Sequence, residues 1–362
     1  MNGHTLRSLA SLVRELGSAC TVLQIAGDDL LAGSQEGVLA CWSVDSGAER
    51  WRIEDEGPVS DLVIDGGRVY ASASVSLRAI DIGTGEVLWD RELEGASDYV
   101  QACEGNIWAA SSVYEIEISD YIEATIWRFD ESGELQERWT EPERPWHFGL
   151  HDDGGVLLGL GRPRCGFMRI RSGEAASHHP IEGDSPVTVG ACGADGRFLF
   201  GHSDGRVSTI LGSEAETFGE DASPVRAITG HSDSWIAGQE SGLIVSSQGW
   251  TALVPGSVDS LSMGPSISQG EAVWASSWKE GSARISVLDR DGGGSLLDLE
   301  HKHQIRHIQA GIGNVAIGDS AGRIHLIEAG VLARRAEEPS DTASDDERRS
   351  RLMERLRQLQ SA

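Results

Sequence analysis

Lysine is almost absent from this sequence of 362 residues, in which Lys279 and Lys302 are the only two. All other basic residues are arginines, and 57 acidic residues outnumber the 30 basic ones, so the formal net charge is −27. Nucleic acids and anionic membranes bind proteins through basic patches that replace phosphate counterions. The shortage of positive charge therefore argues against both classes of partner.

Cysteine is also scarce, and its pattern excludes two further classes of protein. The chain has five cysteines, an odd number, and no Cys-x-x-Cys pair. A disulfide framework or a zinc knuckle needs paired cysteines at short, regular spacing. We therefore expect reduced thiols.

Long hydrophobic runs are missing as well. No apolar segment approaches the roughly 20 residues that a membrane-spanning helix needs. The first 16 residues are interrupted by Arg7, Arg14 and Glu15, which is unlike a secretion signal. From these absences we predict a cytoplasmic protein.

A short apolar segment recurs along the chain at intervals of roughly 40 residues. Its fourth residue is small in seven of eight copies, the exception being Leu160, which indicates that neighbouring repeats crowd the backbone there. The eight copies begin at Leu30, Val69, Ile107, Leu157, Phe198, Trp235, Val273 and Val315.

Each copy is flanked by alternating apolar stretches and by glycine-rich or aspartate-rich turns, a pattern typical of a four-stranded antiparallel meander. Such a sheet buries both faces only by stacking on its neighbours around an axis. We therefore predict an all-β, eight-bladed β-propeller over residues 19–336, in which residues 304–336 supply all four strands of the last blade. Seven blades is the alternative, if one unit is degenerate or the N-terminal segment completes a partial one.

The segment Ala79–Trp89, AIDIGTGEVLW, resembles the repeat of the quinoprotein-like propellers, and Trp42–Trp51 is a shorter version. The resemblance implies that the Asp and Gly of the motif build a tight turn between the third and fourth strands, and that the Trp docks on the adjacent blade. WD40 repeats are the competing resemblance. Their Gly-His pair precedes the first strand of a repeat, whereas Gly201-His202 ends a core strand.

Two tails flank the repeats. Residues 1–18 precede the repeats, and within them residues 5–16 are predicted to form a short amphipathic helix capped by Thr5. Residues 337–344 read as a polar linker, and 345–362 as a basic helix. This C-terminal helix is predicted to dock on the acidic body, pair with a copy of itself or bind a partner groove, through a stripe formed by Leu352, Leu356 and Leu359.

Catalytic chemistry has little support in the sequence. The quinone enzymes of the resembling family bind pyrroloquinoline quinone and calcium in the funnel and mostly carry adjacent cysteines, which this chain lacks. No Gly-x-Ser-x-Gly elbow or phosphate-binding loop occurs in a suitable context. We expect a non-enzymatic protein without a cofactor. The alternative is an enzyme with a metal or cofactor in the propeller funnel.

Three histidines near the last repeat are the candidate metal ligands. His301, His303 and His307 would share one face of a continuous strand, and imidazole binds zinc, copper and iron. The stretch spans the predicted junction of two blades, where a turn breaks the alternation, and no carboxylate stands at ligand spacing. We therefore expect structural or solvated histidines, with this trio as the alternative.

Exposed aromatic residues are the candidates for partner binding. Most of the eleven tryptophans fall in predicted strands, but Trp146, Trp250 and Trp278 lie near loops or strand ends. The third repeat also carries an enlarged turn that contains Tyr114 and Tyr121. The sequence thus predicts a protein-interaction scaffold whose acidic rim and loops favour a basic protein partner.

The excess of carboxylates over lysine has two explanations that the sequence leaves open. It resembles the composition of proteins from salt-accumulating cytoplasms, where high ionic strength screens self-repulsion. It also fits a GC-rich genome, which codes arginine in preference to lysine.

Thermal unfolding in KCl separates these two explanations. If the protein is adapted to salt, its unfolding midpoint will rise steeply between dilute buffer and molar KCl, because the salt screens repulsion among the surplus carboxylates. Circular dichroism melts over a KCl series measure this. A midpoint that does not move with KCl contradicts the salt adaptation.

Overall fold

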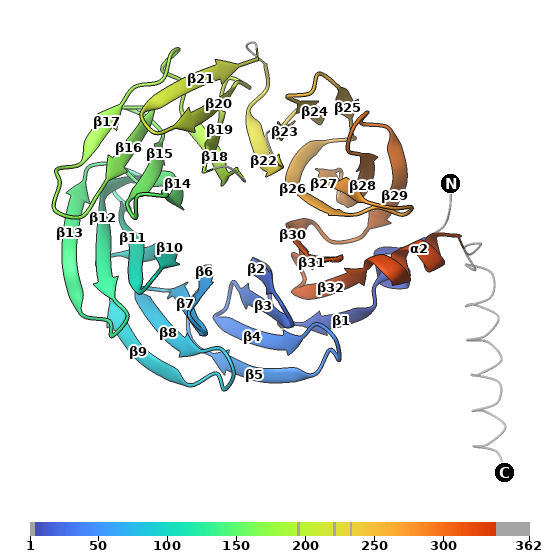
Figure 1. The fold of residues 1–362 in the computed structure, drawn as a ribbon, viewed down its shortest axis with the longest axis horizontal. Coiled ribbons are helices and arrows are strands. Elements are labelled where there is room, and N and C mark those ends of the chain that lie inside the picture. The colour runs from blue at the N-terminus through green and yellow to red at the C-terminus, as the bar shows by residue number, and fades with distance from the viewer. Residues whose placement is uncertain (1–3, 194–195, 220–221, 232–233, 338–362) are drawn as a thin grey trace.

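The computed structural model describes residues 4–193, 196–219, 222–231 and 234–337. Eight four-stranded antiparallel sheets stand around a central axis (Figure 1), which confirms the eight-bladed propeller. The first strand of each blade lies nearest the axis, and successive strands follow outward. None of the helices in the described ranges has the length and apolar content to cross a membrane.

The blades are numbered here in chain order. Blade 1 comprises β2 (Cys20–Ala26), β3 (Asp29–Ser34), β4 (Val38–Ser43) and β5 (Glu49–Glu54), and blade 2 comprises β6 (Val59–Asp65), β7 (Arg68–Ala73), β8 (Ser76–Asp81) and β9 (Val87–Glu92). Blade 3 comprises β10 (Ala96–Cys103), β11 (Asn106–Glu115), β12 (Asp120–Asp130) and β13 (Leu135–Glu141). Blade 4 comprises β14 (Pro145–Leu150), β15 (Val156–Leu160), β16 (Phe167–Ile170) and β17 (Ser177–His179). Blade 5 comprises β18 (Val187–Cys192), β19 (Phe198–His202), β20 (Val207–Leu211) and β21 (Glu214–Phe218). Blade 6 comprises β22 (Val225–His231), β23 (Ser234–Gln239), β24 (Leu243–Ser246) and β25 (Thr251–Leu253). Blade 7 comprises β26 (Ser257–Pro265), β27 (Glu271–Lys279), β28 (Ser282–Asp289) and β29 (Ser295–His301). Blade 8 contains β30 (Ile305–Gly311), β31 (Asn314–Asp319), β32 (Arg323–Glu328) and, from the other end of the chain, β1 (Leu12–Glu15).

The small residue of the repeat lies on the second strand, where the next blade packs against it. A Cβ atom on Gly33 would lie 2.7 Å from the Cβ of Val59 in blade 2. On Gly238 it would lie 2.4 Å from Cγ1 of Val258 in blade 7. Both distances are shorter than van der Waals contact, so a larger side chain would push the blades apart.

Blade 4 shows that the repeat there starts one residue earlier than the sequence indicated. The crowded position is Gly159, where a Cβ would lie 2.8 Å from Cγ1 of Val187 in blade 5. The segment therefore begins at Val156 rather than Leu157. Leu160 follows the crowded position, so it is no exception to the rule that this position is small.

The turn motif joins neighbouring blades as the family resemblance implies. The Asp81 side chain accepts hydrogen bonds from the Thr84 amide at 2.8 Å and the Thr84 hydroxyl at 2.9 Å. Gly85 adopts a φ of +75°, and a Cβ there would lie 2.6 Å from Cγ of Trp51. Trp51 of blade 1 also donates its indole N–H to the Ile82 carbonyl at 2.7 Å. The ring of Trp51 therefore lies directly on the blade 2 turn.

The ring closes by pairing the two ends of the propeller. β1 is the outer strand of blade 8 and pairs antiparallel with β32, from Leu12 opposite Leu326 to Glu15 opposite Arg323. The expectation that residues 304–336 supply all four strands of the last blade was therefore wrong. Residues after β32 turn into α2 (Ala329–Glu337) instead.

The N-terminal tail differs from the predicted helix over residues 5–16. Only α1 (Leu6–Leu9) is helical, with Thr5 capping it by accepting a hydrogen bond from the Ser8 amide. The following residues form β1 because pairing with the open edge of β32 satisfies their backbone groups, which outweighs local helical periodicity. The predicted linker 337–344 is described only at Glu337, the last residue of α2. The predicted helix 345–362, with its leucines 352, 356 and 359, lies outside the described residues.

Substitution in the closing segment tests how much stability the ring closure supplies. Leu16 follows β1, is 2% exposed and packs in a cluster that joins blade 8 to blade 1. We expect Leu16→Ala to lower the free energy of unfolding by about 2–5 kcal/mol, because the buried side chain is lost and a cavity remains. Urea unfolding measures the change. Leu253→Ala, at a site 77% exposed, is the matched control; equal effects of the two substitutions would contradict the role of closure.

Candidate functional site

An extended hairpin in blade 3 carries the largest group of exposed apolar side chains among the residues described. β11 and β12 have 10 and 11 residues, compared with six in most strands of blades 1 and 2. The turn between them exposes Ile116 and Ile118, and the exposed fraction of Ile116 is 81%. Tyr114 and Ile122 are also exposed. The blade core therefore does not bury this tip.

Two aromatic residues predicted as partner anchors meet beside the turn of this hairpin, where Tyr114 pairs with Tyr121. The rings of Tyr114 and Tyr121 lie 5.1 Å apart at 73°, an edge-to-face contact. Arg144, in the segment that leads into blade 4, lies above both Tyr121 and Trp146, at 4.7 and 5.4 Å from the ring centroids. Trp146 is 45% exposed. The structure thus joins three predicted anchors into one surface, here called the aromatic hairpin surface: Tyr114, Ile116, Ile118, Tyr121, Ile122 and Trp146.

Arg144 holds this surface together, and the sequence analysis did not single it out. Its guanidinium donates to Asp98 at 2.8 Å, and Asp98 is buried and also accepts from the Ser112 hydroxyl. This fixed ion pair keeps the cation in place between the two aromatic rings. The sequence could have indicated Arg144 through its position two residues before Trp146. Its partner Asp98 could not be found in this way, because it lies 46 positions away in the sequence.

The other predicted anchors do not belong to this surface. Trp250 was expected to be exposed, but it is only 9% exposed and donates to the Arg290 carbonyl at 2.9 Å. It is the fourth-strand docking residue of blade 6, because its ring lies on the Gly293 turn of blade 7. Trp278 is half-buried and packs against the core of blades 7 and 8. Burial between blades explains both differences.

The three candidate metal ligands also separate. His307 lies on the inner strand β30 and lines a small pocket with Cys20 and Asp259. The His303 ring is 5.8 Å from that of His301 but is not part of a ligand group. The predicted trio is therefore wrong as a set, because the turn before β30 breaks the strand.

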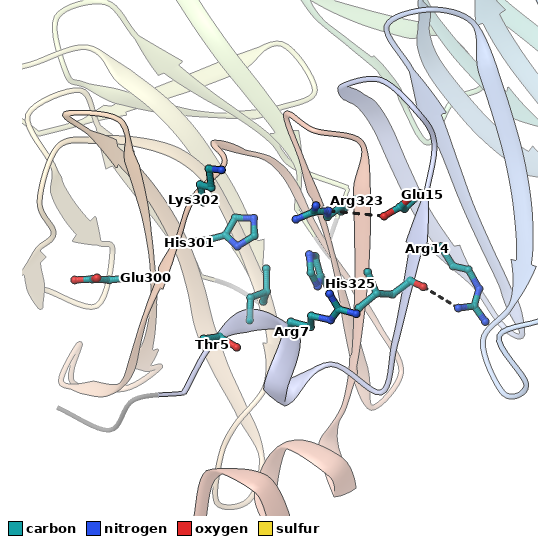
Figure 2. A pocket seen from close by; sticks show the side chains of 11 residues that line it. Thr5, Arg7, Arg14, Glu15, Glu300, His301, Lys302, Arg323 and His325 are labelled. Carbon is teal, nitrogen blue, oxygen red and sulfur yellow. Dashed lines mark hydrogen bonds and ion pairs between the residues drawn. The ribbon is translucent and has the colours of Figure 1, made fainter. Parts of the chain in front are cut away.

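Instead, His301 lies beside two residues that the sequence analysis missed. Asp319 and His325 come from β31 and β32, and their ligand atoms and that of His301 all lie within 4.8 Å of one another. It is the one group of three potential ligands within the described parts of the chain. Figure 2 shows His301 and His325 facing the same pocket. The signal available in the sequence was His325 itself, a histidine within the apolar run that forms β32, the third strand of blade 8.

Residues of the inner strands surround the axis and include buried titratable groups. His147 on β14 lies against Gly190 of blade 5, its Nε2 is buried without a described partner, and burial lowers its pKa to about 4. Burial, with nearby Arg306, lowers the pKa of His307 to about 4. Burial raises the pKa of Asp61 on β6 to about 7, although it accepts hydrogen bonds from two backbone amides.

Comparison with known proteins agrees with the fold and the turn motif. A family model described as outer membrane protein assembly factor BamB matches residues 7–188, just over half of the chain. The chain belongs to this family. The BamB-family match covers blades 1 to 4, and the first three of these blades carry the Asp, Gly and Trp of the turn motif. No curated protein matches the chain.

Solved structures similar to this BamB-family chain share its ring architecture at low sequence identity. The computationally designed protein Ika8 is 17% identical with a TM-score of 0.70, covering 88% of this chain and 99% of its own. The β-propeller domain of Myceliophteria thermophila Cps50 (Swd1) is 14% identical with a TM-score of 0.56, covering 88% and 98%. Saccharomyces cerevisiae Sqt1 is 10% identical with a TM-score of 0.69, covering 91% and 99%. At these identities the likeness concerns the fold alone.

The buried histidine His147, on an inner strand near the propeller axis, makes the stability of the fold depend on pH. The pKa of His147 is below that of an unfolded histidine, near 6.5, so the unfolded state takes up protons first and stability falls as the pH drops from about 6.5 to about 4. Asp61 acts in the opposite sense, because its pKa is raised. We expect His147→Gln to flatten the fall by up to about 1.4 kcal/mol per pH unit.

Urea unfolding between pH 7 and pH 4.5 measures this slope. Replacement of the exposed His178 by Gln is the control, and it should leave the slope unchanged. A His147→Gln protein with the wild-type slope would show that this histidine is protonated in the folded state.

Proposed function

We propose that this BamB-family propeller is a non-enzymatic scaffold that binds another protein through the aromatic hairpin surface, and that it does so in the cytoplasm. The observation that carries the proposal is the cluster of solvent-exposed isoleucines and aromatic rings held in place by Arg144. Solvent-exposed apolar side chains that cluster on a rigid frame are typical of protein contact sites. The description of the family as an outer membrane protein assembly factor is consistent with such a role.

The chemistry of the surface defines the partner. Residues 114–123 contain four carboxylates and no basic residue: Glu115, Glu117, Asp120 and Glu123. An apolar tip flanked by negative charge is complementary to a segment in which leucine-like residues alternate with lysine or arginine. The net charge of −27 favours the approach of such a basic partner over longer distances. We therefore propose a basic, amphipathic protein segment as the ligand.

The frame explains why binding here would cost little entropy. The hairpin strands continue β11 and β12, whose pairing runs unbroken into the buried core of blade 3, apart from a single register shift beside Val113. Tyr114 on β11 is paired with Tyr121 on β12, directly opposite it in the hairpin. Because the strands are already paired, a partner orders only its own residues when it binds.

The test compares two double variants of the full chain. We expect Ile116→Ser/Ile118→Ser to weaken partner binding at least tenfold, because exposed apolar anchors at contact sites contribute most of the binding energy. The control, Leu211→Ser/Leu253→Ser, removes two exposed leucines from blades 5 and 6 and should bind normally. Immobilised wild type and both variants are exposed to lysate of the native organism, and retained proteins are quantified by mass spectrometry.

Two outcomes contradict the proposal. If the proteins retained by wild type are retained equally by the hairpin variant, the aromatic hairpin surface is not the contact site. If retention is lost equally from both variants, the loss is nonspecific and the proposal also fails. Binding that weakens with added salt is expected for the basic partner, since Glu117 and Asp120 are exposed and the other two carboxylates are partly exposed, so salt screens them.

A further inference from the structure

A pocket of about 450 Å³ lies between blades 7 and 8, beneath the N-terminal segment. The N-terminal wall consists of residues 5–7 and 13–15, and the opposite wall comes from the end of β29 and the start of β32 (Figure 2). Its lining carries more positive than negative side chains: Arg7, Arg14, Lys302 and Arg323 against Glu15 and Glu300, with Glu15 paired to Arg323 at 3.9 Å. In a chain with a net charge of −27 and only two lysines, such a grouping is unusual.

His301 lines this pocket and forms a fixed pair with Asp319, which lies behind it. His301 Nε2 lies 2.9 Å from Oδ2 of Asp319, which is fully buried. The other carboxylate oxygen accepts hydrogen bonds from the amides of Ala321 and Arg323, each at 2.9 Å. Backbone donors therefore orient the carboxylate, as outer contacts orient the ligands of metal sites.

His325 is the residue that this structure does not otherwise explain. It is 2% exposed, and neither ring nitrogen has a hydrogen-bond partner among the described residues. Its ring lies 5.6 Å from that of His301, nearly perpendicular to it. A buried polar atom without a partner costs about 1–3 kcal/mol. The buried histidine of blade 5, His202, avoids this cost because both its nitrogens are paired, with Ser185 and Ser208.

From this arrangement we propose that His301, Asp319 and His325 bind a divalent first-row transition metal ion of the zinc class. Two imidazoles and one carboxylate are a common donor set for such ions. Coordination would satisfy the unpartnered nitrogen of His325. Ligand atoms on one tetrahedral zinc ion are about 3.3 Å apart at metal–nitrogen distances near 2.0 Å. His301 and Asp319 already lie within this spacing, so metal binding requires the widest separation in the group, up to 4.8 Å, to shorten by up to about 1.5 Å.

The geometry also assigns the remaining position on the metal. Three protein ligands leave at least one coordination position open, unlike a closed structural site with four. His301 and His325 line the pocket, so this position faces it. Arg7, Arg14, Lys302 and Arg323 outnumber Glu15 and Glu300 in the lining, and this positive balance favours an anionic fourth ligand, such as a carboxylate or phosphate. The proposal is independent of the aromatic hairpin surface, because it involves none of the same residues.

Titration calorimetry with zinc ions on tag-free, chelator-treated full-length protein tests the proposal. We expect one zinc ion per chain with a Kd below about 1 µM, and weakening of at least about 100-fold in His325→Ala, which removes a ligand. Asp319→Asn keeps the shape and can still accept the backbone hydrogen bonds, so it tests ligation even if His325→Ala folds poorly. Thermal unfolding of each variant checks folding.

The control is His303→Ala, which removes a neighbouring imidazole that does not belong to the ligand group, and it should bind zinc within about twofold of wild type. The absorption spectrum of the cobalt(II) form provides a second readout, since its bands report coordination by imidazole and carboxylate. Substoichiometric zinc binding overturns the proposal. Binding that is unchanged in both Asp319→Asn and His325→Ala, or weakened equally in His303→Ala, also overturns it.

Discussion

The four residues of β1 pair with β32, and this contact between the two ends of the propeller closes the ring. Without it, blade 8 would expose the unpaired edge of β32 to solvent. Closure also places α1 over the core of blades 7 and 8, where Leu6 and Leu9 are fully buried. The α2 residue Arg335 then donates to the Ala10 carbonyl at 2.6 Å, so both ends of the propeller are joined beyond the blade itself. The pocket that contains His301 has the closing segment as one wall, so that site depends on ring closure.

The architecture was predictable because it repeats. One packing contact, a small residue under the first strand of the next blade, recurs in most blades and therefore leaves a mark at regular intervals in the sequence. The ends of the chain were not predictable in the same way. Leu6, Leu9 and Leu12 have helical spacing, yet Leu12 is in a strand because the edge of β32 is available to it. That edge is more than 300 residues away in the sequence, and local periodicity carries no information about it.

The candidate sites were predictable only in part, for a related physical reason. Tyr114 and Trp146 were found because exposed aromatic residues stand out against a repeat that buries its own. Their connection through Arg144 and Asp98 was not, since it joins residues 46 positions apart. Likewise, His301 was recognised as a possible ligand, but Asp319 and His325 come from different strands of the next blade. A repeat predicts which positions lie in equivalent places, whereas a site depends on the few side chains that differ between blades.

Both candidate sites lie on the same face of the ring, where the second strand of a blade ends and the third begins. They occupy opposite sides of that face, in blade 3 and between blades 7 and 8 (Figure 1). Their charge balance is opposite as well, since residues 114–123 carry only carboxylates, whereas cations outnumber carboxylates in the lining of the pocket. Exposed charges are screened over about 8–10 Å at physiological salt, which is short compared with the width of a propeller. We therefore propose that the two surfaces select their ligands separately: the hairpin a cationic segment, and the pocket an anion beside a metal ion.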